Sequence, residues 1–187
     1  MFTLGNHLDN KAMKLLMLIL VGFIVLPISV SASPFGAGVY GANVPYGGET
    51  SLTIATDGNV NVSVTPSDSG TLASANSVVT ITSTDVVGYK LYVRALTSTN
   101  LTNGASTLPA SGNGSPAALA VNTWGYNTDA SSDFVGMTLS DVLIRNRTGP
   151  YSSGDATTVT YGVKVDNSKS SGSYSTTVVY TAVPQTQ

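Results

Sequence analysis

Hydrophobic and polar residues alternate with a period of two through most of the chain after residue 50, as they do in β-strands with one buried face. Alternating runs predict strands around residues 52–54, 60–64, 79–81 and 87–95. The Asp57-Gly58 pair predicts a tight turn between the first two runs. In the run 87–95 we expect a buried face of Val87, Tyr89, Leu91, Val93 and Ala95, and a wet face of Gly88, Lys90, Tyr92 and Arg94.

The clearest alternation comes near the C-terminus, in the runs 158–165 and 174–182. Polar residues 166–172 separate the two runs, and we predict that the runs pair as a β-hairpin. Four side chains of this hairpin are expected to face one core: Tyr161, Val163, Val178 and Tyr180. Thr160 is expected on the opposite, wet face.

Two segments have a weaker pattern. Residues 97–116 are of low complexity and too polar to bury, and a connection of this length predicts either a functional loop or an edge hairpin. Residues 134–147 suit a helical turn or a strand, of which we favour a strand after a short turn. Because no long helix is expected here, residues 51–187 are predicted to be all-β and to form a single antiparallel β-sandwich of about seven or eight strands.

The first 32 residues have the pattern of an export signal. Lys11 and Lys14 precede the apolar run 15–28, which is shorter than a typical membrane span. Small residues at Val30-Ser31-Ala32 predict cleavage after Ala32 of this signal-peptide helix. The alternatives are an uncleaved membrane anchor and a buried core helix. We therefore expect a secreted, extracellular protein with no transmembrane segment in its mature chain.

Residues 33–50, rich in glycine, proline and aromatic residues, are predicted to form an extended N-terminal arm. Phe35, Ala37 and Val39 alternate with glycine, so the arm could add as a donor strand to a sheet edge of a neighbouring subunit. In the alternative, the arm pairs with its own sheet or stays disordered, because glycine weakens a strand.

The composition of the mature chain narrows the possible functions. It contains no cysteine, and the one histidine, His7, lies upstream of the signal, so thiol and imidazole chemistry are closed to it. Six basic and nine acidic side chains give a net charge of −3 with no basic stripe, which argues against a nucleic-acid partner. Serine and threonine supply 45 of its 155 residues, as is common on extracellular β-proteins. We expect neither an enzyme nor a cofactor.

Three groups of residues are candidate sites, and two of them include residues close to Trp124 in sequence. Asn127, Asp129 and Asp133 are loop oxygen donors that suit calcium, although the spacing matches no EF-hand; Asp129 and Asp133 are a poor catalytic pair, because aspartate is ordinary in such turns. Trp124, Tyr126 and Tyr151, with Tyr46, suit a sugar-stacking platform, whereas core packing is the commoner role of such rings. Lys90 and Lys164 are strand lysines placed for a lysine–asparagine cross-link or for plain solvation.

Three stretches resemble the C-terminal part of secreted bacterial cell-surface proteins: residues 122–126 (NTWGY), 158–165 (TVTYGVKV) and 172–181 (GSYSTTVVYT). They are similar to WxL-type cell-wall proteins and to surface proteins of candidate-phylum bacteria. Trp124-Gly125-Tyr126 and Val179-Tyr180-Thr181 stand where that family has its paired Trp-x-Leu motifs, which puts wall attachment in doubt.

The resemblance and the composition imply a non-enzymatic surface protein with a structural or adhesive role. Its expected partners are cell-surface or wall polymers, or copies of itself. The alternatives are a pilin-like filament subunit that uses the arm 33–45 and a carbohydrate-binding module.

Overall fold

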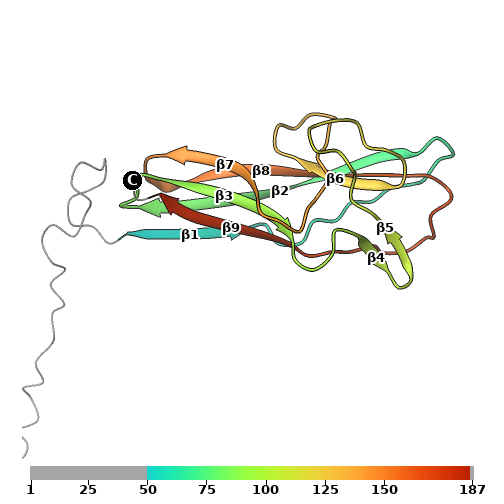
Figure 1. Cartoon of the computed structure of the whole chain (residues 1–187), viewed down its shortest axis with the longest axis horizontal. Coiled ribbons are helices and arrows are strands. Elements are labelled where there is room, and N and C mark those ends of the chain that lie inside the picture. The colour runs from blue at the N-terminus through green and yellow to red at the C-terminus, as the bar shows by residue number, and fades with distance from the viewer. Residues whose placement is uncertain (1–49, 186–187) are drawn as a thin grey trace, which may run out of the picture. The chain divides into compact units, whose positions relative to one another are not determined.

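A computed structural model describes residues 50–185, which are all-β and contain nine strands (Figure 1). The strands are β1 (Ser51–Thr56), β2 (Thr71–Thr84), β3 (Gly88–Ala95), β4 (Leu101–Asn103), β5 (Ser106–Leu108), β6 (Thr123–Asn127), β7 (Val142–Thr148), β8 (Tyr151–Val165) and β9 (Val178–Gln185). Within this part of the chain no helix is long and apolar enough to cross a membrane. The predicted signal and most of the predicted arm, with Phe35, Ala37 and Val39, lie outside the described residues.

The strands form two larger sheets and a small hairpin. One sheet has the order β1-β2-β8-β6, the other has the order β7-β3-β9, and every neighbouring pair in them is antiparallel. The third unit is the hairpin of β4 and β5. This hairpin confirms the edge-hairpin alternative for residues 97–116, and β7 confirms the strand preferred in residues 134–147.

Both larger sheets contribute to one hydrophobic core. From β3 come Tyr89, Leu91, Val93 and Ala95, all fully buried as their alternation predicted. Val87, expected on the same face, is only half-buried, and Gly88, expected on the wet face, is buried. The four-stranded sheet supplies Val79, Ile81, Val159, Val163 and Trp124 to the same cluster. Tyr161 and Tyr180 meet across the two sheets, with their hydroxyl oxygens 2.5 Å apart. The predicted common core of these two strands is therefore confirmed.

The predicted β-hairpin of the two C-terminal strands is wrong. β8 pairs with β2 and β6, whereas β9 pairs with β3 in the other sheet. Between them the chain turns at Asp166–Lys169 and then pairs Ser175 with Thr102 of β4. A period-two pattern shows which side chains are buried, but it does not say which strand lies alongside.

The second face of β8 is also covered, which corrects the expectation of a wet face at Thr160. Thr160 is 7% exposed, and a Cβ atom at Gly162 would collide with the ring of Phe134. A Cβ atom at Gly125 would likewise meet Phe134 and the carbonyl of Val135. The loop that precedes β7 therefore packs on glycines of β6 and β8, where side chains would hold it off.

Candidate strand-accepting edge

The strand predicted at residues 60–64 is wrong, and its absence leaves part of β2 with one neighbour. β1 pairs only with the second half of β2, from Val79 to Thr84. The first half, from Thr71 to Val78, pairs with β8 on one side. No described residue forms a strand on its other side.

Two hydrogen bonds fix the direction in which the backbone groups of this half point. The amide N–H of Val78 donates to Oδ2 of Asp57, which follows the end of β1, at 2.8 Å. The carbonyl of Lys164, the β8 partner of Leu72, accepts from the N–H of Asn122 at 2.7 Å and so points away from β2. Both bonds mean that even-numbered residues in this half of β2 turn their N–H and C=O away from β8, because residues in an antiparallel ladder alternate in direction.

Leu72, Ser74 and Asn76 therefore present six backbone groups toward an edge on which no described strand pairs. Their N–H and C=O groups have no hydrogen-bond partner among the described residues. Leu72 is 44% exposed, and Ser74 and Asn76 are also exposed. An unpaired row of this kind is a template on which another strand can add.

Residues 58–66 lead from the end of β1 to the turn before β2, toward the far end of the domain in Figure 1. None of their backbone groups bonds to a described backbone group. Val60, Val62 and Val64 are half-buried and alternate with exposed residues, and Val62 and Val64 pack on the core. The alternation that predicted a strand is therefore present in burial but not in hydrogen bonding.

The interior beside this edge is only partly closed. Ala73 and Ala75, the inward-facing residues between the outward ones, are small and partly exposed. Tyr161 lies opposite Ala75 on β8 and is also only partly buried, as is Tyr180. Burial first, and then the neighbouring Tyr180, raises the pKa of Tyr161, so the hydroxyl pair stays protonated at neutral pH. The site thus combines free backbone groups with an uncharged, small-residue interior.

The other polar cluster joins the two sheets. Asp155 of β8 accepts hydrogen bonds from the Tyr89 hydroxyl at 2.5 Å, from Arg145 Nη2 at 3.0 Å and from Arg147 Nε at 3.0 Å. Burial is the largest influence and raises the pKa of Asp155, but the bonds from Arg145, Tyr89 and Arg147 together hold it below its usual range. Burial, and then the bond to Asp155, raises the pKa of Tyr89 to about 12. All three donors bind the one carboxylate of Asp155, so this cluster is a structural link between the two sheets.

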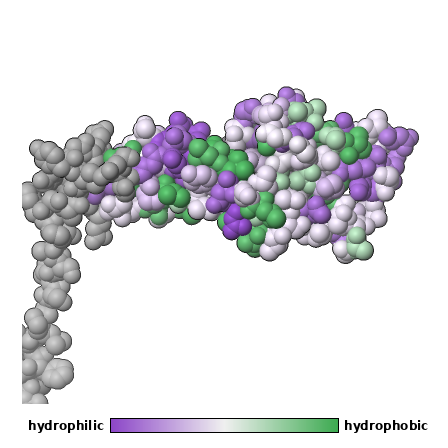
Figure 2. Space-filling model, in the orientation of Figure 1, coloured by the Kyte–Doolittle hydropathy of each residue, from purple (hydrophilic) through white to green (hydrophobic). Residues whose placement is uncertain are grey.

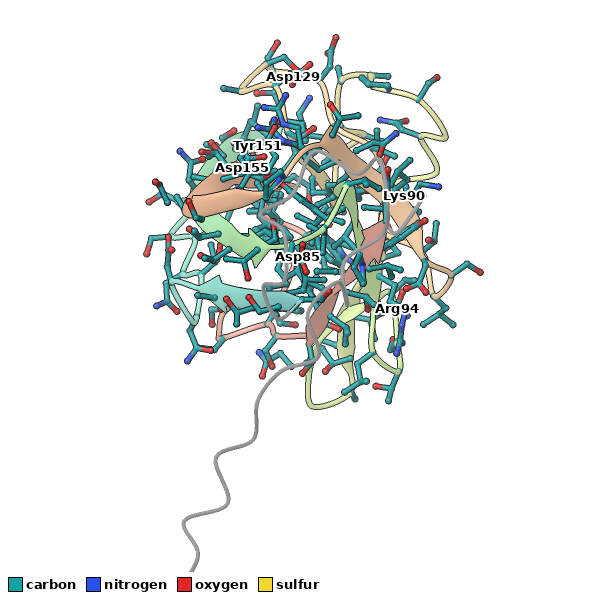
Figure 3. All side chains as sticks on the ribbon, turned by 90° about the vertical axis from the view of Figure 1, so that its left-hand side faces the viewer. Asp85, Lys90, Arg94, Asp129, Tyr151 and Asp155 are labelled. Atoms are coloured by element: carbon teal, nitrogen blue, oxygen red, sulfur yellow. The ribbon has the colours of Figure 1, made fainter. Side chains whose placement is uncertain are left out.

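The predicted calcium donors are only partly used to hold their own loop, because Asn127 Oδ1 is buried with no hydrogen-bond partner among the described residues. Asn127 donates from Nδ2 to the carbonyls of Ser131, at 2.9 Å, and Asp133, at 3.0 Å. Asp129 accepts from the Ser131 N–H at 3.1 Å, which lowers its pKa, and it lies at the periphery of the domain (Figure 3). Across residues 50–185 no group of three or more acidic, histidine or cysteine side chains is placed to hold a metal.

The predicted sugar platform is not assembled. Trp124 and Tyr126 are 3% and 4% exposed, and Trp124 Nε1 donates to the Thr99 carbonyl at 2.8 Å. Tyr151 packs edge-on against Tyr89 near Asp155, on the part of β8 that precedes the residues paired with β6 (Figure 3). Tyr46 lies outside the described residues. The rings of Trp124 and Tyr126 belong to the core and leave no face for stacking on a sugar.

The two strand lysines have separate surroundings. Lys90 lies opposite Asn146 of β7 and Val183 of β9, and the Asn146 amide oxygen accepts from Gln185 Nε2. Lys164 lies opposite Leu72 and Thr123. Lys90 and Asn146 thus lie directly opposite each other on the neighbouring strands β3 and β7. No asparagine lies opposite Lys164 in either of its two ladders.

The sequence analysis did not identify the unpaired edge of β2. The only sequence feature that marks this edge is a set of small residues at inward positions where large ones are usual. Ala73, Ala75 and Ser77 occupy the inward positions of this half of β2, where Val79 and Ile81 occupy them in the other half. The strand predicted at residues 60–64 also hid it, since that strand would have filled the vacant position.

Comparisons of the chain with models of known families, with curated proteins and with solved structures found no match. The likeness of the C-terminal residues to secreted surface proteins stays a prediction from the sequence.

Proposed function

We propose that the chain is a secreted, non-enzymatic surface protein with a structural role, built on one antiparallel β-sandwich that joins to further chain by strand addition. The observation that carries the proposal is the vacant edge at Leu72, Ser74 and Asn76. A strand that binds there gains main-chain hydrogen bonds along the edge and apolar contacts beneath it.

The export signal predicted from the sequence and the surface composition support the extracellular setting. Much of the visible face carries residues of intermediate hydropathy, as serine and threonine have, with hydrophobic residues scattered among them (Figure 2). A surface of this kind is typical of a protein that stays soluble without a high net charge.

A structural role fits the use of the polar side chains better than an adhesive role through sugars does. Asp155, Arg145 and Arg147 bind one another across the sheets, and Asn127 holds its own loop. Trp124 and Tyr126, the rings most suited to sugar stacking, are in the core.

Light scattering on the secreted form tests the assembly part of this proposal. We expect oligomers whose mean mass rises with protein concentration and which resist mild heating. A protein that stays monomeric at high concentration would contradict assembly by strand addition. Cell fractionation with electron microscopy tests the location: we expect the protein outside the membrane in extended structures, and recovery in the cytoplasm would contradict it.

A further inference from the structure

We infer that the vacant edge of β2 is filled by the arm of a second copy of this chain, with Phe35, Ala37 and Val39 directed into the core beside Ala73 and Ala75. This inference rests on the proposed function and names the partner of the same site.

The arm matches the edge in length and in period. Ala73, Ala75 and Ser77 span five residues of β2, and Phe35, Ala37 and Val39 span five residues as well. Side chains that lie beside each other on neighbouring strands point to the same side of the sheet. Phe35, Ala37 and Val39 then point inward with Ala73 and Ala75, and the two glycines point outward.

The arm also matches the edge in volume and charge. Ala73 and Ala75 are partly exposed, and Val62, Val64, Tyr161 and Tyr180 pack at the rim of the same core. An added phenylalanine and valine would bury apolar surface here that is now only half covered. Residues 33–48 carry no charged side chain, so none would be desolvated.

The position of the arm favours a second copy over the same copy. Thr50, where the described chain begins, donates to the carbonyl of Asp85, next to the end of β2 that pairs with β1. Ser74 lies ten residues along β2 from Thr84, which is about 33 Å at the rise of a strand. Antiparallel addition places Val39 beside Ala73, twelve residues or about 40 Å along the chain from Asp85, whereas the eleven residues from Val39 to Thr50 span only about 36 Å at the same rise. The arm of the same copy therefore falls short, and an arm from another copy joins copies head to tail in an open chain.

The decisive experiment mixes a chain that can only accept with a chain that can only donate. In the acceptor, Phe35→Asp and Val39→Asp place charges on the inward face of the arm. In the donor, Ser74→Pro removes one outward N–H without breaking the β2–β8 ladder, because proline is tolerated on edge positions. Asn76→Pro is a second donor of the same design.

We expect each variant to be monomeric alone and their equal mixture to form dimers and nothing larger in analytical ultracentrifugation. Ala75→Pro is the matched control, since Ala75 directs its N–H toward β8, so this change should lower the melting temperature by far more than Ser74→Pro does. If the Ser74→Pro chain and the Asn76→Pro chain both fold and each still assembles like the wild type, the inference is overturned.

A mixture that stays monomeric while the wild type assembles would also overturn it, because the arm then acts within one copy or at another surface. In both outcomes, proline variants that still assemble or a mixture that stays monomeric, the wild type assembles and the proposed function survives. If the wild type is itself monomeric at every concentration, the proposed function fails together with the inference.

Discussion

Glycine at residue 162 sets the position of a whole loop. The Phe134 ring occupies the space in which a Cβ atom at Gly162 would lie, and Phe134 is 2% exposed. The same loop lies over Gly125 of the neighbouring strand, β6. An aromatic side chain on facing glycines of two paired strands closes the outer face of the sheet with few atoms.

We therefore expect Gly162→Ala to destabilise the domain by about 1–3 kcal/mol, because the added methyl group overpacks this contact. The control is the double change with Phe134→Ala, in which the methyl group has room and the two effects are not additive. Urea unfolding of the four chains measures the coupling. Strict additivity of the two changes would show that Phe134 does not lie on Gly162.

Asp155 makes the free energy of unfolding fall at acidic pH. Its side chain is 11% exposed and binds Arg145 and Arg147, and its folded-state pKa lies below the ordinary value near 4. A carboxylate of this kind stabilises the fold fully above about pH 4, and the contribution is lost as the pH falls through the folded-state pKa.

Asp155→Asn should lower the free energy of unfolding by about 1–3 kcal/mol at pH 7, because hydrogen bonds to a charged group are lost. The difference from the wild type should shrink as the pH falls from about 4 toward 2. Denaturant unfolding across that range measures it. A difference that stays constant from pH 7 to pH 2 would mean that the ion pairs do not contribute.

At the scale of the element, β8 is a strand with two covered faces along its second half. Val163 is 9% exposed on the face toward the main core, and Thr160 is 7% exposed on the face under the loop. Thr158, two residues earlier on the Thr160 face, is exposed. The covering loop therefore ends between these two positions of one face.

Aspartate at these three positions separates the two faces. Val163→Asp should unfold the domain, at a cost of about 4 kcal/mol or more, since it buries an unpaired charge. Thr160→Asp should also be costly, whereas Thr158→Asp should change stability by less than about 0.5 kcal/mol. Thermal melting ranks the three. If Thr160→Asp proved as harmless as Thr158→Asp, the loop would not cover this face.

The elements show what a period-two pattern can predict. It gave the buried residues of β3 from Tyr89 to Ala95 and the inward residues of β8 and β9, because burial alternates along any half-buried strand. It did not give the partners of β8 and β9, since pairing depends on the path of the residues between them. It also predicted a strand from Val60, Val62 and Val64, where burial alternates without hydrogen bonds.

The candidate sites show the same limit at the scale of the residue. Trp124 and Tyr126 read equally well as a surface platform and as core, and burial decided for the core. Asn127 and Asp129 read as oxygen donors, but the Asn127 amide nitrogen and the Asp129 carboxylate bond within the loop, and Asn127 Oδ1 is left without a partner there. The edge at Ser74 has no motif, because it consists of backbone groups that every residue carries.

At the scale of the whole molecule, the proposed contact between copies lacks charge. The edge residues Leu72, Ser74 and Asn76 and the inward arm residues are all neutral. Raising sodium chloride from about 50 to 500 mM should therefore leave the association constant within about a factor of three, because screening acts on charges. Sedimentation at both salt concentrations measures this. A loss of tenfold or more would point to an ionic contact elsewhere.

Residue-resolved hydrogen–deuterium exchange tests the central claim, the vacant edge of β2, most directly. In the monomeric Phe35→Asp, Val39→Asp chain, the amides of Leu72, Ser74 and Asn76 should exchange rapidly, while those of Ala73 and Ala75 should be protected by β8. In assembled wild type, all five amides should be protected. Leu72, Ser74 and Asn76 amides that exchange as fast in the assembly as in the monomer would contradict strand addition at this edge.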